Sequence, residues 1–312
     1  MNNSMLYKKK RPLVLFLIPA TLLMIIFLYY PFLSNFFNAF RTYGSGITAQ
    51  ATGWQDPWFS AFWSPSYSSE GFYSGQIPLL QDPAFLAALK NTGILVLAAV
   101  FLQVGLSLVL SLLVDNVRHG ASVYRTIYFF PIVISATALG LFFQLLFKDY
   151  GPIQHYLTNV PEGNALFTDE KHYLLPLLIS VVWQYVGFYF VIIATGLNNI
   201  SADLYEAASI DGASNWQVVW YLKIPLLRNT INSCILLAAT GALKVYDMPN
   251  ALFPAITSNT PWRWTLGTLM YERAYTPRIN AVSTGAAIAV VIVVLGILLS
   301  GFINLVCRDK DY

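Results

Sequence analysis

Residues 204–225, LYEAASIDGASNWQVVWYLKIP, place three charged side chains between two strongly apolar segments. These side chains are Glu206, Asp211 and Lys223. The whole chain is 56% hydrophobic and 11% charged, whereas a soluble domain has roughly 45–50% apolar and about 25% charged residues. This composition indicates a membrane protein, so the charged stretch is expected to lie outside the hydrocarbon layer.

Six apolar segments are long enough to span a membrane, since a hydrocarbon core about 30 Å thick requires roughly 20 residues of helix. All six are predicted to be helices, because backbone polar groups in lipid must pair within the segment and no alternating barrel pattern occurs. The first is read as a retained helix, since its apolar run exceeds that of a signal peptide. The segments are residues 12–37, 92–114, 126–147, 173–197, 229–252 and 281–306.

Basic residues set the expected orientation. Lysine and arginine adjoin the first segment at residues 8–11, whereas the basic residues of the opposite side are spread over long loops. The rule that positive loops stay inside therefore predicts that both termini and the stretch at 204–225 are cytoplasmic. The net charge of +3 comes with no soluble basic face, which argues against a nucleic-acid partner. Cys234 and Cys307 fall inside or at the end of predicted helices, where they imply no disulfide framework.

The polar stretch has the local signals of two short helices joined by a turn. Asp203 and Glu206 have the spacing of a capping box at the start of the first helix. Gly212 is placed to end that helix in a left-handed conformation. Ser214, with a glutamine three residues later, repeats the start signal, and the second helix is expected to end before Pro225.

The same stretch resembles the EAA loop of ABC importer permeases. That pattern is EAA, three residues, G, nine residues, then I, any residue, L and P. This chain has EAASIDG at 206–212 and LKIP at 222–225, so that Leu222 and Ile224 exchange the usual apolar pair. The longer form LYEAASIDGA is similar to the carbohydrate branch of the family, the maltose-type permease subunits.

Three further stretches agree with this resemblance, which extends over roughly residues 80–306. They are QDPAFLAALKNTG at 81–93, YRTIYFFP at 124–131 and TPWRWTLGTLMYERAY at 260–275. The family usually has Gly-Gly-Pro where this chain has Asn259, Thr260 and Pro261, so the departure lies at the first two positions.

The resemblance implies an all-α, polytopic subunit with six transmembrane helices and a cytoplasmic helix-turn-helix loop at 201–225. The chain then divides into a basic N-terminus (1–11), a first helix (12–37), a long external loop and lead-in (38–91), a permease core (92–306) and a cytoplasmic C-terminus (307–312). It would be a multi-pass protein of the cell membrane, forming half of a path for a sugar or oligosaccharide. The residues expected to contact an ATPase are Glu206, Ala207, Ala208, Asp211, Gly212 and Pro225.

The resemblance also implies partners. They are a second permease subunit, two ATP-binding subunits, an external solute-binding protein and a carbohydrate cargo. No GxxxxGK[ST] loop occurs in the chain, so ATP and Mg²⁺ are expected in the partner ATPase and no cofactor in this chain. Taken alone, Glu206 also fits a simple capping role, and Asp211 fits an ordinary turn. The competing function is an ATP-independent secondary transporter or channel, for which six spans would serve as well.

Candidates for the substrate pathway come first from ionisable residues within the spanning segments, which are rare and by default functional. Lys244 and Asp247 are one turn apart, a spacing that allows them to pair on a helix face and, with Tyr246, to bind a polar solute. The alternative is that they mark a helix end, where charged side chains reach the interface. Trp183 and Gln184 are further candidates, although polar groups there also serve as contacts between helices.

The external connection at residues 43–85 is rich in tryptophan and tyrosine. Aromatic rings stack on sugars, but they also settle at membrane interfaces, and this second interpretation is the favoured one. A third interpretation is docking of an external solute-binding protein. No metal site and no catalytic motif such as HExxH or GxSxG is present in the sequence. The sequence therefore predicts a transport subunit that is not itself an enzyme.

Overall fold

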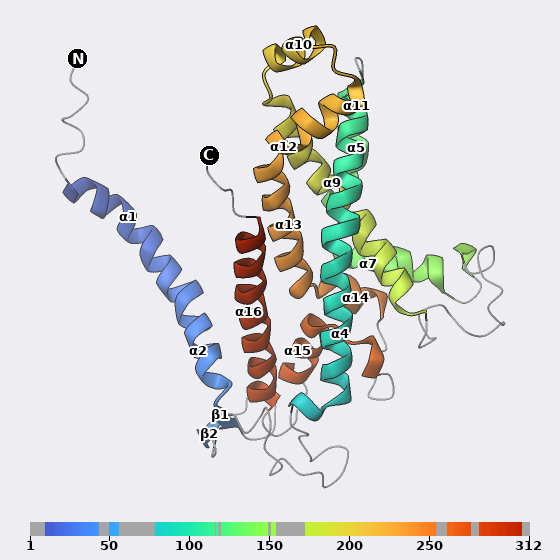
Figure 1. Ribbon diagram of the computed structural model, residues 1–312. Coiled ribbons are helices and arrows are strands. Elements are labelled where there is room, and N and C mark those ends of the chain that lie inside the picture. Colours follow the sequence, from blue (N-terminus) through green and yellow to red (C-terminus); the bar gives the residue numbers. More distant parts are fainter. Residues whose placement is uncertain are drawn as a thin grey trace. The chain divides into compact units, whose positions relative to one another are not determined.

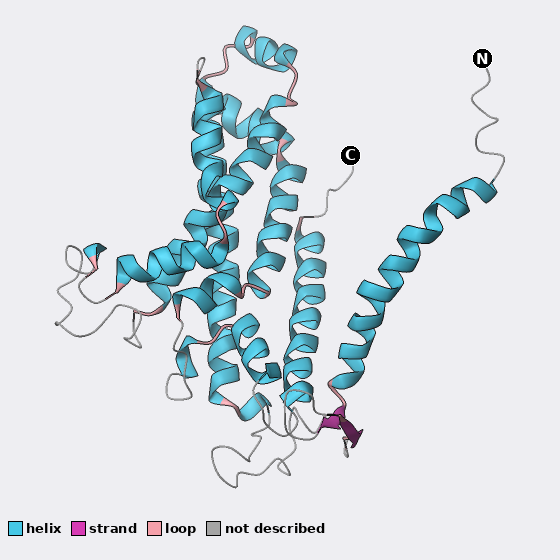
Figure 2. Ribbon diagram, turned by 180° about the vertical axis from the view of Figure 1, so that it is seen from behind, coloured by secondary structure: helices cyan, strands magenta, loops and turns pink. Residues whose placement is uncertain are grey.

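The computed structural model describes residues 10–43, 50–55, 79–115, 117, 120–148, 151–153, 172–253, 261–275 and 281–307. In these residues the regular structure is helical apart from one small two-stranded sheet (Figure 2). The chain forms two compact units, one of residues 1–80 and 270–290 and the other of residues 81–269 and 291–312.

Four described helices are long and apolar enough to cross a membrane, and the number rises to as many as six if each of two bent helix pairs is one span. The straight candidates are Phe16–Asn38, Pro83–Asp115, Leu174–Asn198 and Val282–Val306. The bent pairs are Ala121–Val133 with Ala136–Phe147, and Asn215–Leu226 with Arg228–Leu243. All six predicted apolar segments thus correspond to helical structure, although two of them are not single helices.

The first unit begins with a nearly unbroken helix. It consists of α1 (Lys10–Met24), the wide π-helical segment η1 (Ile25–Tyr29) and α2 (Tyr30–Asn38). The wide segment comes just before Pro31, which has no amide hydrogen for an ordinary helical bond. The side chains of this helix from Phe16 to Phe32 are exposed.

A small β-hairpin follows this helix. Strand β1 (Arg41–Tyr43) pairs antiparallel with β2 (Ala51–Trp54). The buried amide of Gln55 donates to the carbonyls of Ala39 and Arg41, each at 3.2 Å, and to Ser283 Oγ at 2.7 Å. Ser283 belongs to the start of α16 (Ala281–Val306), so one glutamine fastens the β-hairpin to that helix.

The second unit is built around a 33-residue helix, Pro83–Asp115. It comprises α4 (Pro83–Ala98), the π-helical segment η3 (Ala99–Val104) and α5 (Gly105–Asp115). It begins nine residues before the predicted start at 92, because Asp82 caps the first turn by accepting from the Ala84 amide at 2.9 Å and Pro83 suits the first helical position. The short 3-10 helix η2 (Leu79–Gln81) comes just before it.

The predicted single helix at 126–147 is wrong. The structure has α6 (Ala121–Val133) and α7 (Ala136–Phe147), which meet at an angle of 91° because the backbone leaves the helical conformation at Ile134 and Ser135. Each half packs on a different neighbour. Helix α6 lies against α9 (Leu174–Asn198), and α7 lies against α14 (Asp247–Leu252). Tertiary packing therefore decides this bend.

The predicted single helix at 229–252 is also wrong. Helix α13 (Arg228–Leu243) ends where Lys244 leaves the helical conformation at φ −110° and ψ 12°. After Tyr246, at φ −131°, the chain starts α14 in a new direction. The short 3-10 helix η5 (Pro261–Arg263) and α15 (Leu266–Tyr275) complete the described elements outside the region at 201–226.

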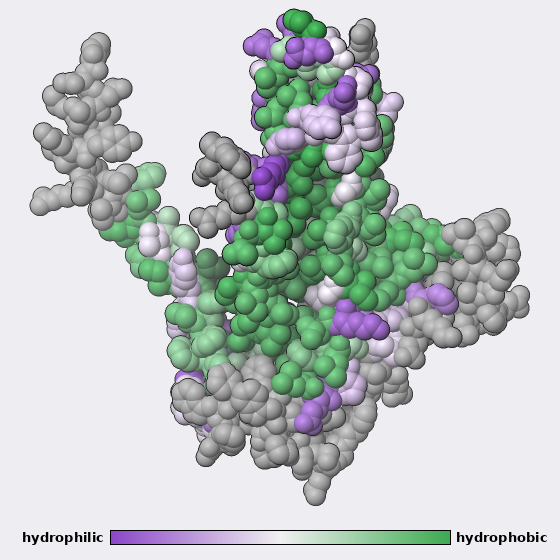
Figure 3. All heavy atoms as spheres, in the orientation of Figure 1, coloured by the Kyte–Doolittle hydropathy of each residue, from purple (hydrophilic) through white to green (hydrophobic). Residues whose placement is uncertain are grey.

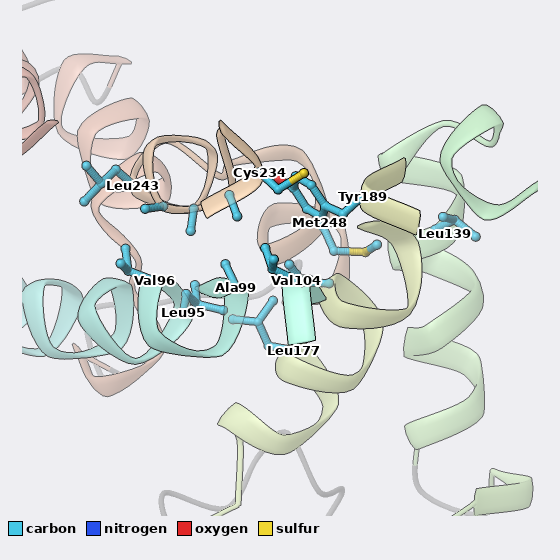
Figure 4. Close-up of a cluster of buried hydrophobic side chains, with 14 of the residues drawn as sticks. Leu95, Val96, Ala99, Val104, Leu139, Leu177, Tyr189, Cys234, Leu243 and Met248 are labelled. Atoms are coloured by element: carbon cyan, nitrogen blue, oxygen red, sulfur yellow. The ribbon is translucent and has the colours of Figure 1, made fainter. Parts of the chain in front are cut away.

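The core of the second unit is a continuous apolar cluster between the long helix, α9, α13 and α14. Figure 4 shows Leu95, Val96 and Ala99 pointing toward the helix that carries Cys234 and Leu243. Two serines of α5 add polar contacts to α9 by donating to backbone carbonyls. The outward surface of the helices is largely hydrophobic (Figure 3), as required of side chains that face lipid.

Candidate functional site

The site is the helical hairpin of residues 201–226, whose first helix lies at one end of the second unit, beyond the end of α5 (Figure 1). We call it the hairpin. Its first arm is α10 (Ala202–Ile210). Its second arm is continuous from Asn215 to Leu226 and comprises α11 (Asn215–Gln217), the π-helical η4 (Val218–Lys223) and α12 (Ile224–Leu226). The second arm is bent by 65° from α13.

Gly212 makes the turn between the two arms. Its φ is +74°, a conformation that costs a residue with a side chain about 1–2 kcal/mol. The Gly212 amide donates to the Ser209 carbonyl at 3.1 Å, and the Ala213 amide donates to the Ala208 carbonyl at 2.9 Å. This pair of bonds is the Schellman motif, which satisfies carbonyls at a helix end. The predicted left-handed stop is confirmed.

The start of the first arm differs from the prediction. Ser201, not Asp203, occupies the N-cap position, and its side chain makes no capping bond. Asp203 lies in the first turn, where its charge favours the positive end of the helix dipole. Glu206 is therefore not the reciprocal partner of a cap, and its side chain is free for another role.

The start of the second arm agrees with the prediction. Ser214 and Gln217 form a capping box, in which the Gln217 amide donates to Ser214 Oγ at 3.4 Å and the Ser214 amide donates to Gln217 Oε1 at 2.7 Å. With this cap at one end and the Schellman turn at the other, the connection between the arms is closed by hydrogen bonds. Such a turn holds the two arms at a defined angle.

The prediction that the second arm ends before Pro225 is wrong. The helix continues through Pro225 to Leu226, and Pro225 lies in the first turn of α12. The wide turns of η4 come directly before it, as the wide segment in the first unit comes before Pro31. A widened turn accommodates a proline ring that an ordinary α-helical turn would place against a carbonyl.

One face of α10 is open to solvent. Asp203, Glu206, Ala207 and Ile210 have the i, i+3, i+4, i+7 spacing of a single helix face, and all four are exposed. Ile210 is 86% exposed, which is unusual for an isoleucine at the end of a capped helix. Ala208 and Tyr205 lie on the partly buried side. Across the described residues, no hydrogen bond or ion pair to the Glu206 side chain is found.

Lys223 belongs to the site, although the sequence pattern assigned it no role. Its Nζ lies 2.6 Å from Asp115 Oδ2 at the end of α5, and its side chain is 7% exposed. The ammonium also lies 5.4 Å from the centre of the Tyr205 ring in α10. The pKa of the Tyr205 hydroxyl is raised, chiefly by burial and then by the Asp115 carboxylate. The Lys223 ammonium, which belongs to the second arm, thus contacts both the first arm and the end of the long helix.

The substrate-pathway candidates are only partly brought together. Lys244, Tyr246 and Asp247 all lie at the break between α13 and α14. Lys244 and Asp247 therefore mark helix ends, as the alternative interpretation holds, and do not share a helix face. Lys244 and Asp247 are exposed and Tyr246 is partly buried. The backbone here is close-packed, since a Cβ on Gly267 would lie 2.5 Å from the Val245 carbonyl.

Trp183 and Gln184 point in different directions. Trp183 is 44% exposed and meets Phe143 of α7 edge-to-face at 5.6 Å. Gln184 is 3% exposed, and its Oε1 is buried without a hydrogen-bond partner in the described part of the chain. The two residues therefore do not line one surface.

At the opposite end of the long helix, two stretches singled out in the sequence come into contact. Asn91 is fully buried and donates to the carbonyls of Trp262 and Trp264 at 2.7 and 2.8 Å. Its Oδ1 accepts from the Tyr173 hydroxyl at 2.5 Å. Thr92 accepts from the Leu266 amide at 2.9 Å. The stretch at 81–93 thus holds the lead-in to α15.

Most of the aromatic connection at 43–85 lies outside the described residues, as do Asn259 and Thr260. Trp54 is described and lies under the Arg41 guanidinium at 4.9 Å. Among the described residues, no group of three or more histidine, cysteine, aspartate or glutamate side chains is placed to hold a metal ion.

A bundle of apolar helices with two bent helix pairs and a capped hairpin at one end is the architecture of a polytopic membrane protein. Residues 107–310 match the family described as binding-protein-dependent transport system inner membrane component. The chain belongs to this family. It is a permease subunit of an ABC transporter of the importing kind.

Relatives and a solved structure agree with this assignment. The chain is 26% identical over 294 residues to a probable ABC transporter permease of Bacillus subtilis, with 91% of this chain and 92% of the relative covered. It is 26% identical to a lactose transport system permease of Rhizobium radiobacter, with 75% and 73% covered. A crystal structure of a bacterial ABC transporter involved in alginate import has a similar fold, with a TM-score of 0.75, 19% identity and 98% of both chains covered.

Proposed function

We propose that this chain forms half of the translocation path of an ABC importer for a carbohydrate and couples to a separate ATPase through the hairpin. The observation that carries the coupling role is the exposed face of α10, on which Glu206 has no partner in the described part of the chain. A single carboxylate beside Ala207 and Ile210 suits a small groove with one basic residue, because the alanine permits close approach and the isoleucine supplies apolar contact.

The stiffness of the hairpin supports the same role. Asp211 and Gly212 close the first arm, and Pro225 lies near the end of the second, where the chain turns into α13. A short helix transmits displacement only if its ends are held, and here the turn is fastened by backbone bonds and a capping box. Glu206, Ala207 and Ala208 would make the contact, while Asp211, Gly212 and Pro225 would fix its geometry.

The break at Lys244–Tyr246 supports a place on the substrate pathway. Helices interrupted at membrane depth are tolerated where the free backbone groups are buried in protein or line a cavity. Lys244, Tyr246 and Asp247 supply hydrogen-bonding groups for a polar solute, and the exposed ring of Trp183 is suited to stacking on a sugar. The carbohydrate class rests on the lactose transport relative.

The proposed partners are supported by the family and by the exposed face of the hairpin. A binding-protein-dependent system requires an external solute-binding protein, and the hairpin requires an ATPase, two copies of which would bind ATP and Mg²⁺. A second permease subunit would complete the path. Both termini would lie on the cytoplasmic side with the hairpin.

The coupling role is tested in the complex assembled with its ATP-binding subunits. We expect Glu206→Ala to weaken the binding of those subunits by about 2 kcal/mol or more, because truncating one partner of a buried charge pair leaves the other unpaired. Co-purification and ATP hydrolysis in proteoliposomes measure this. Asp203→Asn is the matched control, since it removes a neighbouring exposed carboxylate from the same helix face. Equal losses in both variants, or none in Glu206→Ala, would contradict the proposal.

The cargo is tested separately by a thermal-shift screen of the cognate solute-binding protein. Mono- and oligosaccharides, polyols and sugar phosphates are the probes. We expect stabilisation by a sugar or oligosaccharide. Stabilisation by none of the sugars but by another class of solute would refute the carbohydrate assignment and leave the coupling role intact.

A further inference from the structure

Lys223 is buried on a hairpin that otherwise exposes its charges. Lysine is almost never fully buried unless it is paired, because removing an ammonium from water is costly. Here the side chain is 7% exposed, and the Asp115 carboxylate at 2.6 Å is 22% exposed. This ion pair joins residues 108 positions apart in the sequence. It connects the second arm of the hairpin to the last residue of the helix Pro83–Asp115.

The first arm contacts the same cation. The Lys223 Nζ lies 5.4 Å from the centre of the Tyr205 ring, within the range of a cation–π contact. Tyr205 lies on the partly buried side of α10, next in sequence to the exposed Glu206. A displacement imposed on the exposed face of α10 is therefore transmitted to Lys223 through the Tyr205 ring. From Lys223 it is transmitted to Asp115 through the ion pair.

The helix that receives this contact extends to the other end of the unit. Its 33 residues correspond to about 50 Å of helix. Along its length Ser107 and Ser111 donate to the carbonyls of Val186 and Phe190 in α9. Near its far end Asn91 holds the carbonyls of Trp262 and Trp264 before α15. A single helix thus has the hairpin at one end and the lead-in to α15 at the other.

We propose that Asp115, Lys223 and Tyr205 form a joint that makes the hairpin and the long helix Pro83–Asp115 move as one body during transport. These three are positioning residues, since they act through the hairpin and touch neither nucleotide nor cargo. The inference rests on the coupling function proposed above and adds a route for the motion. The joint adds a side-chain connection between the hairpin and the long helix to the two chain connections of the hairpin, at α9 and α13.

The joint is tested by measuring the distance between spin labels on the two parts it connects. Ser209→Cys places a label on an exposed position of α10, and Leu113→Cys places one on α5, where Leu113 is 61% exposed. Cys234→Ala and Cys307→Ala remove the native thiols. The labelled full chain is assembled with its ATP-binding subunits in nanodiscs and measured without nucleotide and after trapping with ATP and vanadate.

In the otherwise unaltered chain we expect the same distance in both states, because the joint holds the two labels together. In Lys223→Met, which keeps an apolar stem but removes the charge, we expect the distance to change between the states by more than about 2 Å, the scale of helix shifts in switching proteins. Asp115→Asn removes the charge from the other side and is expected to behave in the same way, even if Lys223→Met assembles poorly. Lys90→Met is the matched control, since Lys90 is exposed near the far end of the helix.

Two results would overturn the joint. One is a distance that already changes between the states in the unaltered chain, and the other is an unchanged distance in both charge-removing variants. Neither result depends on the cargo. A failure of the coupling function itself would appear differently, as loss of the ATP-binding subunits or of ATP hydrolysis before any distance is measured.

Discussion

At the scale of single residues, glycines determine where this chain turns and where helices approach closely. Gly212 and Gly187 illustrate two different reasons. At Gly212 an added Cβ would meet nothing within 4 Å, so the constraint is its φ of +74°. At Gly187 an added Cβ would lie 1.6 Å from the Tyr128 carbonyl oxygen, so the constraint is space between α9 and α6.

We predict that Gly212→Ala weakens the first arm of the hairpin by about 1–2 kcal/mol, because alanine strains a left-handed backbone. Hydrogen exchange of the α10 amides in the purified chain measures this as a roughly 5- to 30-fold loss of protection. Gly212→Asn is the matched control and should stay near the original value, because asparagine tolerates this conformation. Equal protection in the alanine variant would show that the turn is not strained.

We predict that Gly187→Ala lowers the thermal midpoint of the detergent-solubilised chain, at a cost of about 1–3 kcal/mol for overpacking. The α9 and α6 helices must separate to admit even one methyl group. Gly93→Ala is the control, since a Cβ there meets nothing within 4 Å and alanine favours the helix. The prediction fails if the two variants have the same midpoint.

At the scale of elements, polar contacts at helix ends decide how neighbouring segments are placed. The Asn91 side chain satisfies two carbonyls of the lead-in to α15 and one hydroxyl of the segment before α9. Removing it leaves buried polar groups without partners, whereas removing an exposed neighbour does not. Such contacts explain how the short segment before α15, which includes η5, is held against the long helix.

We predict that Asn91→Leu destabilises the chain by about 2–3 kcal/mol, because the carbonyls of Trp262 and Trp264 lose their shared donor. Thermal unfolding followed by circular dichroism measures the change. Lys90→Met, at the adjacent exposed position, is expected to have little effect. A stable leucine variant would mean that the carbonyls find other donors.

At the scale of the whole molecule, the basic residues near the N-terminus predict that the hairpin lies on the cytoplasmic side of the membrane. We predict that a membrane-impermeant thiol reagent modifies Ser209→Cys only in inverted vesicles and Lys90→Cys only in right-side-out vesicles. The two positions lie toward opposite ends of the second unit, on α10 and α4. The background is the chain with Cys234→Ala and Cys307→Ala. Modification of Ser209→Cys from the outside would refute the cytoplasmic placement and the coupling function with it.

The sequence by itself determined the class of protein and the location of the hairpin. Six apolar segments predict membrane helices because lipid offers no partners for backbone groups, and this is independent of how the helices pack. The Schellman turn at Gly212 and the capping box at Ser214 were predictable for a similar reason, since each is completed by residues within a few positions of one another.

Only the tertiary structure decided the breaks at Ile134–Ser135 and Lys244–Tyr246 and the partner of Lys223. Apolar periodicity does not distinguish one spanning helix from two short ones that pack on different neighbours. The Asp115–Lys223 pair has no local signal, because its members are 108 positions apart. Contacts between distant residues depend on the packing of the whole bundle, and no short stretch of sequence contains that information.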